Sequence, residues 1–174
     1  PTGLVINRDL KVGQRGAEAE TVTMGFEQHM GHYYPFTLAS KLKAITEPSP
    51  WYTPEGGPAS PWGRAIIPIE MISVLLGSSG DRAGLHGRGP AVGLFAGQQI
   101  RLVKGPLFVG QAYDLAREII ALSESARTES VWVRTQVFEA GTRTLAAEMI
   151  LNHATLKASY AHYEKEAREL GLAA

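Results

Sequence analysis

The sequence predicts an α+β protein in which one antiparallel sheet wraps around a single buried helix. From Ile66 to Leu76 nearly every residue is apolar, and such a segment is typical of a helix that is covered on all sides. After Ala91 apolar and polar residues alternate, which is typical of half-buried strands. Since one sheet covers about half of such a helix, the preceding helices or a second subunit must cover the rest.

The composition limits the classes of protein to consider. A chain of 174 residues with 44% apolar residues is expected to form one domain with a proper core. Lys plus Arg and Asp plus Glu both total 17, so neither a nucleic-acid nor a membrane partner is predicted. The absence of cysteine excludes disulfides and thiolate ligands and is consistent with a cytoplasmic protein. Residues 1–16 contain no long apolar run, so no signal peptide is expected.

The N-terminal part is predicted to combine extended segments, helices and a long loop. Residues 1–22 are expected to be extended or irregular, with a possible short strand at Leu4–Ile6. Residues 24–46 show helical spacing in two pieces, which Pro35 interrupts. Residues 47–63 hold five prolines and three glycines. Loops of this length inside a compact domain are often functional.

The central helix is expected to begin near Pro68, because a proline costs nothing in the first turn, and to end at Gly77. A second glycine-rich loop follows at 77–90. Its glycines do not follow a strand with dinucleotide-binding spacing, so a flexible connection is favoured over a phosphate site.

The C-terminal half is predicted to form four strands and a closing helix. Short turns separate the strands, so consecutive strands are expected to pair antiparallel. A charged helix is expected at about 158–170. The predicted strands are 91–103, 111–123, 129–139 and 143–157.

Three short segments carry a resemblance to a known family. They are SPWYT (49–53), SPWGRAIIP (60–68) and VKGPLFVGQAY (103–113). They resemble the loop, the entry to the central helix and the strand hairpin of the MaoC-like acyl dehydratases and hydratases, which have the hot-dog fold. The resemblance implies one hot-dog domain over 1–174, a homodimer whose sheets continue edge to edge, an acyl-thioester or related small carbonyl substrate, and no cofactor.

Active members of that family use an Asp and a His, with four residues between them, as an acid/base pair before the central helix. At this spacing the chain has Glu47 and Tyr52, so it lacks the usual catalytic His. A tyrosine with its ordinary pKa near 10 is a poor base at neutral pH but can donate a proton. The alternative is that Glu47 ends a helix and that Tyr52 packs beside Trp51.

Two further residues are candidates for catalysis. Glu70 lies in the first turn of the central helix. The resemblance to the hot-dog fold implies a role for it, because another branch of that fold, the acyl-CoA thioesterases, uses a carboxylate on this helix as base or nucleophile. Its alternative role is to stabilise the helix N-terminus through the dipole. His86, in the second glycine-rich loop, is a weaker candidate. His29 and His32 have a spacing that suits a metal, but a third ligand is not visible nearby, so no metal is expected.

Substrate-binding residues are expected around the loop and the helix entry. The aromatic residues of the loop 47–63 suit an acyl pocket, and Arg64 suits a CoA diphosphate. Ile69 stands where the family that the chain resembles has a glycine beside the oxyanion site. The predicted set is Trp51, Trp62, Gly63, Arg64 and Ile69.

Two functions are therefore open. The chain is either a lyase of the dehydratase or hydratase type, with a thioesterase that uses Glu70 as a variant, or a catalytically silent hot-dog subunit that holds an acyl chain or pairs with an active partner. The retained carboxylates favour the enzyme, and the missing histidine favours the silent subunit.

Overall fold

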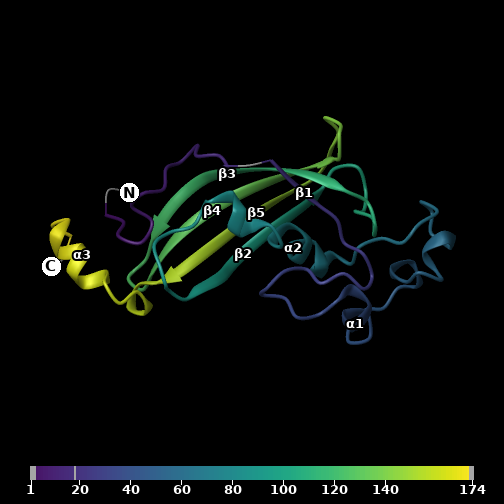
Figure 1. Ribbon diagram of the computed structural model, residues 1–174, viewed down its shortest axis with the longest axis horizontal. Coiled ribbons are helices and arrows are strands. Elements are labelled where there is room, and N and C mark those ends of the chain that lie inside the picture. The colour runs from purple at the N-terminus through teal and green to yellow at the C-terminus, as the bar shows by residue number, and fades with distance from the viewer. Residues whose placement is uncertain (1–2, 18, 173–174) are drawn as a thin grey trace.

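The computed structural model describes residues 3–17 and 19–172. These residues form a five-stranded antiparallel sheet in the order β1-β3-β4-β5-β2. Figure 1 shows α2 against one face of the sheet, with α3 at one end of the molecule and α1 at the other. The strands are β1 (Glu20–Val22), β2 (Gly93–Leu102), β3 (Tyr113–Glu124), β4 (Thr128–Glu139) and β5 (Leu145–Leu156), and the helices are α1 (Leu38–Leu42), α2 (Ile69–Gly77) and α3 (Tyr163–Glu169).

The predicted α+β class and the four long strands are confirmed, whereas the expected pairing of consecutive strands is wrong in one place. Strands β3, β4 and β5 form a meander, but β2 pairs with β5 and not with β3. The reason is the connection 103–112, whose backbone forms hydrogen bonds with the backbone of the segment before α2. Ile67 N donates to Leu107 O at 2.8 Å, and Val109 N donates to Ala65 O at 3.0 Å. The connection therefore crosses the sheet from β2 at one edge to β3, which lies next to the short edge strand β1.

Within the single chain, helix α2 is buried on one face only, so cover of its other side by a second subunit stays a prediction. Met71, Ile72, Leu75 and Leu76 pack into the main core with side chains of β3, β4 and β5. On the other side Ile69 is 59% exposed, and Glu70 is exposed as well. Pro68 is the N-cap and not the first residue of the helix, and the helix ends at Gly77 as expected.

The predicted helices before α2 are mostly absent. Of residues 24–46, only Leu38–Leu42 is helical, and it begins at a capping box in which Thr37 and Ser40 exchange hydrogen bonds. Residues 24–36 are irregular, yet Met24 and Met30 are buried in the core. The spacing of apolar residues in 24–36 therefore belongs to a loop that packs on the core. Apolar spacing alone does not determine the backbone conformation.

The N-terminal segment also differs from its prediction. Leu4–Ile6 is not a strand but leads into a turn at residues 6–9, and β1 occurs further along. Beyond the end of α2, Leu10 and the loop residues Ala83 and Leu85 cover the sheet by packing on Ile119 and Val131. This second cluster replaces the cover that a longer helix would supply.

At the C-terminus α3 begins at Tyr163, later than predicted, because residues 157–159 form a 3-10 turn, η4. In the described part of the chain, each helix is too short or too polar to cross a bilayer.

Candidate functional site

The proline-rich loop folds back onto the entry to α2. It contains two 3-10 turns, η1 (Pro50–Tyr52) and η2 (Gly57–Ala59). Ile66 N donates to Trp51 O at 3.0 Å. The buried Ser60 closes the turn before the helix, because its hydroxyl donates to Arg64 O at 2.7 Å and accepts from Arg64 N at 3.2 Å. The loop is thus held beside the N-terminal end of α2.

Three of the predicted substrate-binding residues meet in one aromatic cluster. The rings of Trp51 and Trp62 meet edge to face, with centroids 5.8 Å apart. Trp62 also contacts Phe108, at 6.4 Å between centroids, and the Arg64 guanidinium lies 3.7 Å from the centre of the Phe108 ring. Edge-to-face pairs and cation–π contacts of this kind each contribute about 0.5–1.5 kcal/mol. We call these four residues the aromatic cluster.

Phe108 was not predicted as a site residue. It lies on the connection 103–112, far from the loop in sequence, and the only signal was its place in the family-like segment VKGPLFVGQAY. Its backbone N–H donates to the hydroxyl of the buried Tyr113 at 2.8 Å. Burial raises the pKa of Tyr113 above its ordinary value of 10, so this hydroxyl stays protonated and fixes the Phe108 backbone.

The other predicted binding residues flank the cluster. Gly63 has a φ of +70°, and a Cβ built there would have nothing within 4 Å. Glycine is therefore required by the backbone of the turn and not by a lack of space. Ile69 opens α2 on the side that the chain leaves uncovered.

The candidate catalytic groups are not joined to one another. Glu47 and Glu70 are exposed, and Tyr52 is half-buried. Within residues 3–17 and 19–172, no hydrogen bond or ion pair connects any of these three side chains to another group. Glu47 and Tyr52 precede α2 in the chain, whereas the exposed His86 follows it, with its Nδ1 3.2 Å from Gly87 O. Their catalytic roles stay predictions.

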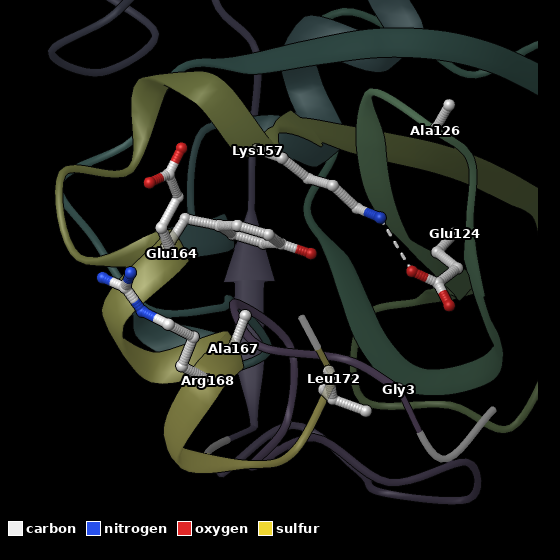
Figure 2. Close-up of a pocket in the computed structure, with 9 residues that line it drawn as sticks. Gly3, Glu124, Ala126, Lys157, Glu164, Ala167, Arg168 and Leu172 are labelled. Carbon is white, nitrogen blue, oxygen red and sulfur yellow. Dashed lines mark hydrogen bonds and ion pairs between the residues drawn. The ribbon is translucent and has the colours of Figure 1, made fainter. Parts of the chain in front are cut away.

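Two cavities lie elsewhere in the molecule. A cavity of about 580 Å³ lies beside α3, and none of the predicted site residues lines it (Figure 2). A smaller one of about 200 Å³ lies near the end of α2 and includes His29 in its wall. Among the residues that the structure describes, no three His, Asp or Glu side chains gather as a metal site would require.

Solved structures resemble the chain over most of its length. An (R)-hydratase from A. caviae involved in PHA biosynthesis is 19% identical, with a TM-score of 0.56 over 84% of this chain and 97% of that chain. A monoamine oxidase regulatory protein from Archaeoglobus fulgius is 13% identical, with a TM-score of 0.63 over 87% and 94%. The C-terminally truncated HadBC (3R-hydroxyacyl-ACP dehydratase) complex from Mycobacterium tuberculosis is 14% identical, with a TM-score of 0.62 over 82% and 96%.

No protein-family model matches the sequence, and no curated protein matches it significantly. The structural similarities confirm the predicted hot-dog fold.

Proposed function

We propose that this hot-dog chain is a lyase of the dehydratase or hydratase type that acts on an acyl thioester or a related small carbonyl compound. The observation that supports this most is the aromatic cluster beside the N-terminal end of α2. Its rings offer an apolar wall for an acyl chain, and Arg64 offers a cation for an anionic group of the substrate. The similar structures that are named a hydratase and a dehydratase support the reaction class.

The proposed chemistry moves one proton and one hydroxyl. Glu47 removes the α-proton of a β-hydroxyacyl thioester, and the electron pair of that C–H bond moves toward the thioester oxygen. Backbone N–H groups at the start of α2 favour the negative charge that develops there. The electrons then form the double bond as the β-hydroxyl leaves, and Tyr52 gives it the proton that makes water. The proton held by Glu47 then returns through solvent to the Tyr52 oxygen, which restores both groups. Hydration is the reverse sequence.

A second chain would complete the site. Strand β2 is an edge of the sheet and is exposed along nearly its whole length. An apolar edge strand with unpaired backbone groups is a template for another strand. We place a second copy along β2, so that the two sheets continue and the uncovered side of α2, with Ile69, is buried. The exposed apolar side chains on and beside β2 are Val92, Leu94, Phe95, Leu102 and Val103.

A second candidate function is a catalytically silent subunit that binds an acyl chain. It is favoured by the phenol of Tyr52 where the family has an imidazole, and by the exposure of Glu47, whose side chain no described residue contacts by a hydrogen bond or ion pair. The thioesterase variant assigns the catalytic carboxylate to Glu70, which is equally exposed in the single chain.

Turnover of a panel of enoyl-, β-hydroxyacyl- and saturated acyl-CoA thioesters tests these functions. For the lyase, Glu47→Gln is expected to lower kcat/KM about 100- to 10,000-fold, the usual loss for a general base, and Tyr52→Phe is expected to lower kcat. Glu55→Gln, an exposed carboxylate of the same loop, is the matched control and should behave as wild type.

The other outcomes identify the alternatives. Loss confined to Glu70→Gln with saturated esters supports the thioesterase, and acyl binding without any turnover supports the silent subunit. Wild-type activity in Glu47→Gln and Tyr52→Phe together with an inactive His86→Ala would contradict the assigned site.

A further inference from the structure

The smaller cavity lies where β1, the irregular loop 28–31 and the segment after α2 meet. The loop lies against the end of α2, because a Cβ built on Gly31 would be 3.5 Å from Ser78 O. Ile69 opens the helix beside the aromatic cluster, and Ser78 follows its last residue. Nine residue steps along a helix separate the two by roughly 14 Å. The cavity is therefore distinct from the proposed acyl-thioester site.

Basic side chains line this cavity, and no carboxylate of a described residue does. The basic residues are Arg82 and His29, and both are exposed. The Arg82 backbone donates to Ser79 O at 3.1 Å, whereas its guanidinium has no ion-pair partner in the described part of the chain. Asp114, which accepts from Thr21 Oγ1 at 2.6 Å, does not line the cavity. The charge of the cavity therefore suits an anion.

Two neutral side chains add hydrogen-bond donors. Gln28 Oε1 accepts from Gly25 N at 3.1 Å, so the amide oxygen is occupied and the NH₂ group is left for a ligand. The Thr23 hydroxyl forms no hydrogen bond with another described residue. Ser78 is not such a donor, because its hydroxyl already donates to Leu75 O at 2.8 Å. The donors come from side chains, unlike those of a glycine-rich phosphate loop, which are backbone N–H groups.

The negative end of α2 lies close to this cavity but is largely compensated. The last carbonyl groups of a helix carry partial negative charge. Here Val74 O accepts from Ser78 N at 3.1 Å, and Leu75 O accepts from the Ser78 hydroxyl. Leu76 O accepts from the guanidinium of Arg117. These bonds leave the donors of the cavity to act on a ligand.

We propose that this cavity binds a phosphate-class oxyanion, either as free phosphate or as the terminal phosphate of a larger molecule. The planar guanidinium of Arg82 suits two of its oxygens, and Thr23, Gln28 and His29 supply donors for the others. A carboxylate has only two oxygens and would leave some of these donors unused. The volume of about 200 Å³ is below the roughly 300–1,000 Å³ of sites for drug-sized ligands, so the bound group is small.

Titration of the full chain with inorganic phosphate, glycerol 3-phosphate and acetate at equal ionic strength tests the proposal. Backbone amide NMR signals report where each anion binds. Phosphate is expected to shift the signals of Thr23, Gln28 and Arg82 saturably, and acetate is expected to bind far more weakly. Tighter binding of glycerol 3-phosphate than of phosphate would identify a larger molecule as the source of the group, and weaker binding would identify free phosphate.

Two variants test the assigned donors. Arg82→Gln and Thr23→Val are each expected to weaken phosphate binding about tenfold or more, because each removes a hydrogen bond to a charged group. Arg143→Gln is the control, since Arg143 is an exposed cation of the β4–β5 turn that does not line the cavity. It should bind phosphate as wild type does, and melting curves should show that all variants are folded.

Three results would overturn the proposal. One is the absence of saturable phosphate binding to wild type, and another is equal affinity for acetate and phosphate. The third is a loss of binding in Arg143→Gln that equals the loss in Arg82→Gln. None of these results bears on turnover at the proposed acyl-thioester site.

Discussion

Arg117 and Glu20 form a buried ion pair between β3 and β1, with 2.6 Å between Nε and Oε2. Their side chains are 8% and 2% exposed. The same guanidinium donates to Leu76 O at the end of α2, to Ser79 Oγ at 3.2 Å and to Thr135 Oγ1 at 3.2 Å. A cation at this place is favourable, because the carbonyl groups at a helix C-terminus carry partial negative charge. One side chain therefore joins α2 to three strands.

Replacing Arg117 by Met should lower the free energy of unfolding by about 3–5 kcal/mol, because it leaves the Glu20 carboxylate buried without its partner. Urea unfolding measures the loss. Arg134→Met is the matched control, since Arg134 and Glu118 form a more exposed pair at 3.0 Å, with side chains 37% and 32% exposed. That change should cost less than about 1 kcal/mol. Equal losses in the two variants would refute the role given to Arg117.

The core face of α2 should tolerate neither charge nor truncation. Met71→Asp or Leu75→Asp should abolish soluble expression, because these side chains are 1% and 0% exposed and either aspartate would be buried without a partner. Leu75→Ala should lower the free energy of unfolding by about 2–5 kcal/mol. Leu170→Ala, at a 45% exposed leucine, is the control in thermal melts. Normal yield of both aspartate variants would contradict the burial of α2.

Lowering the pH should reduce the stability of the fold, because His153 becomes protonated. This residue lies on β5 beside β2, and a Cβ built on Gly93 would collide with its imidazole. Burial lowers the pKa of His153 below its ordinary value of 6.5. The unfolded chain therefore takes up a proton at a higher pH than the folded chain does. The stability that this residue contributes is complete above pH 6.5 and is lost as the pH falls through the lower folded pKa.

Urea unfolding at about pH 7.5 and about pH 5 measures this effect. The difference between the two should be smaller in His153→Gln than in wild type. An identical difference in both proteins would show that His153 does not contribute.

The proposed homodimer makes a direct prediction for β2. Wild type should be a dimer in light scattering at micromolar concentration, and the double variant Phe95→Glu with Leu102→Glu should be a monomer. These side chains are 71% and 39% exposed, so the single chain should stay folded. Val12→Glu is the control, because Val12 lies next to Gly13, which bonds to β3 on the other half of the sheet. A monomeric wild type would disprove the proposed arrangement.

The sequence predicted the strands in which apolar and polar residues alternate regularly. It missed the features that depend on which distant segments come into contact. The alternation after Ala91 placed all four long strands, but alternation does not say which strands pair, so the β2–β5 pairing was missed. Phe26, Met30 and Tyr33 have helical spacing, yet they lie in an irregular loop, in which Met24 and Met30 are buried. Three-residue β1 was missed because a segment this short shows no period.

The candidate site was likewise predicted only in part. Trp51, Trp62 and Arg64 were expected near one another because they belong to the loop and the adjoining helix entry, and the structure brings them together. Phe108 reaches them from a distant segment, so no local pattern could reveal it. Glu70 lies on the side of α2 that the single chain leaves uncovered, so its final environment depends on more than this chain.

The order of strands also affects how the chain is made. Strand β2 ends at Leu102, but its only partner in the described sheet, β5, begins at Leu145. At about 5–20 residues per second, a ribosome needs roughly 2 to 9 s to synthesise the residues between them. Strands β3, β4 and β5 can pair through short hairpins as they emerge, whereas β2 must wait with Leu94 and Phe95 unpaired. The nascent protein is therefore most open to aggregation at β2, and a chaperone that holds this strand would raise the yield of folded chain.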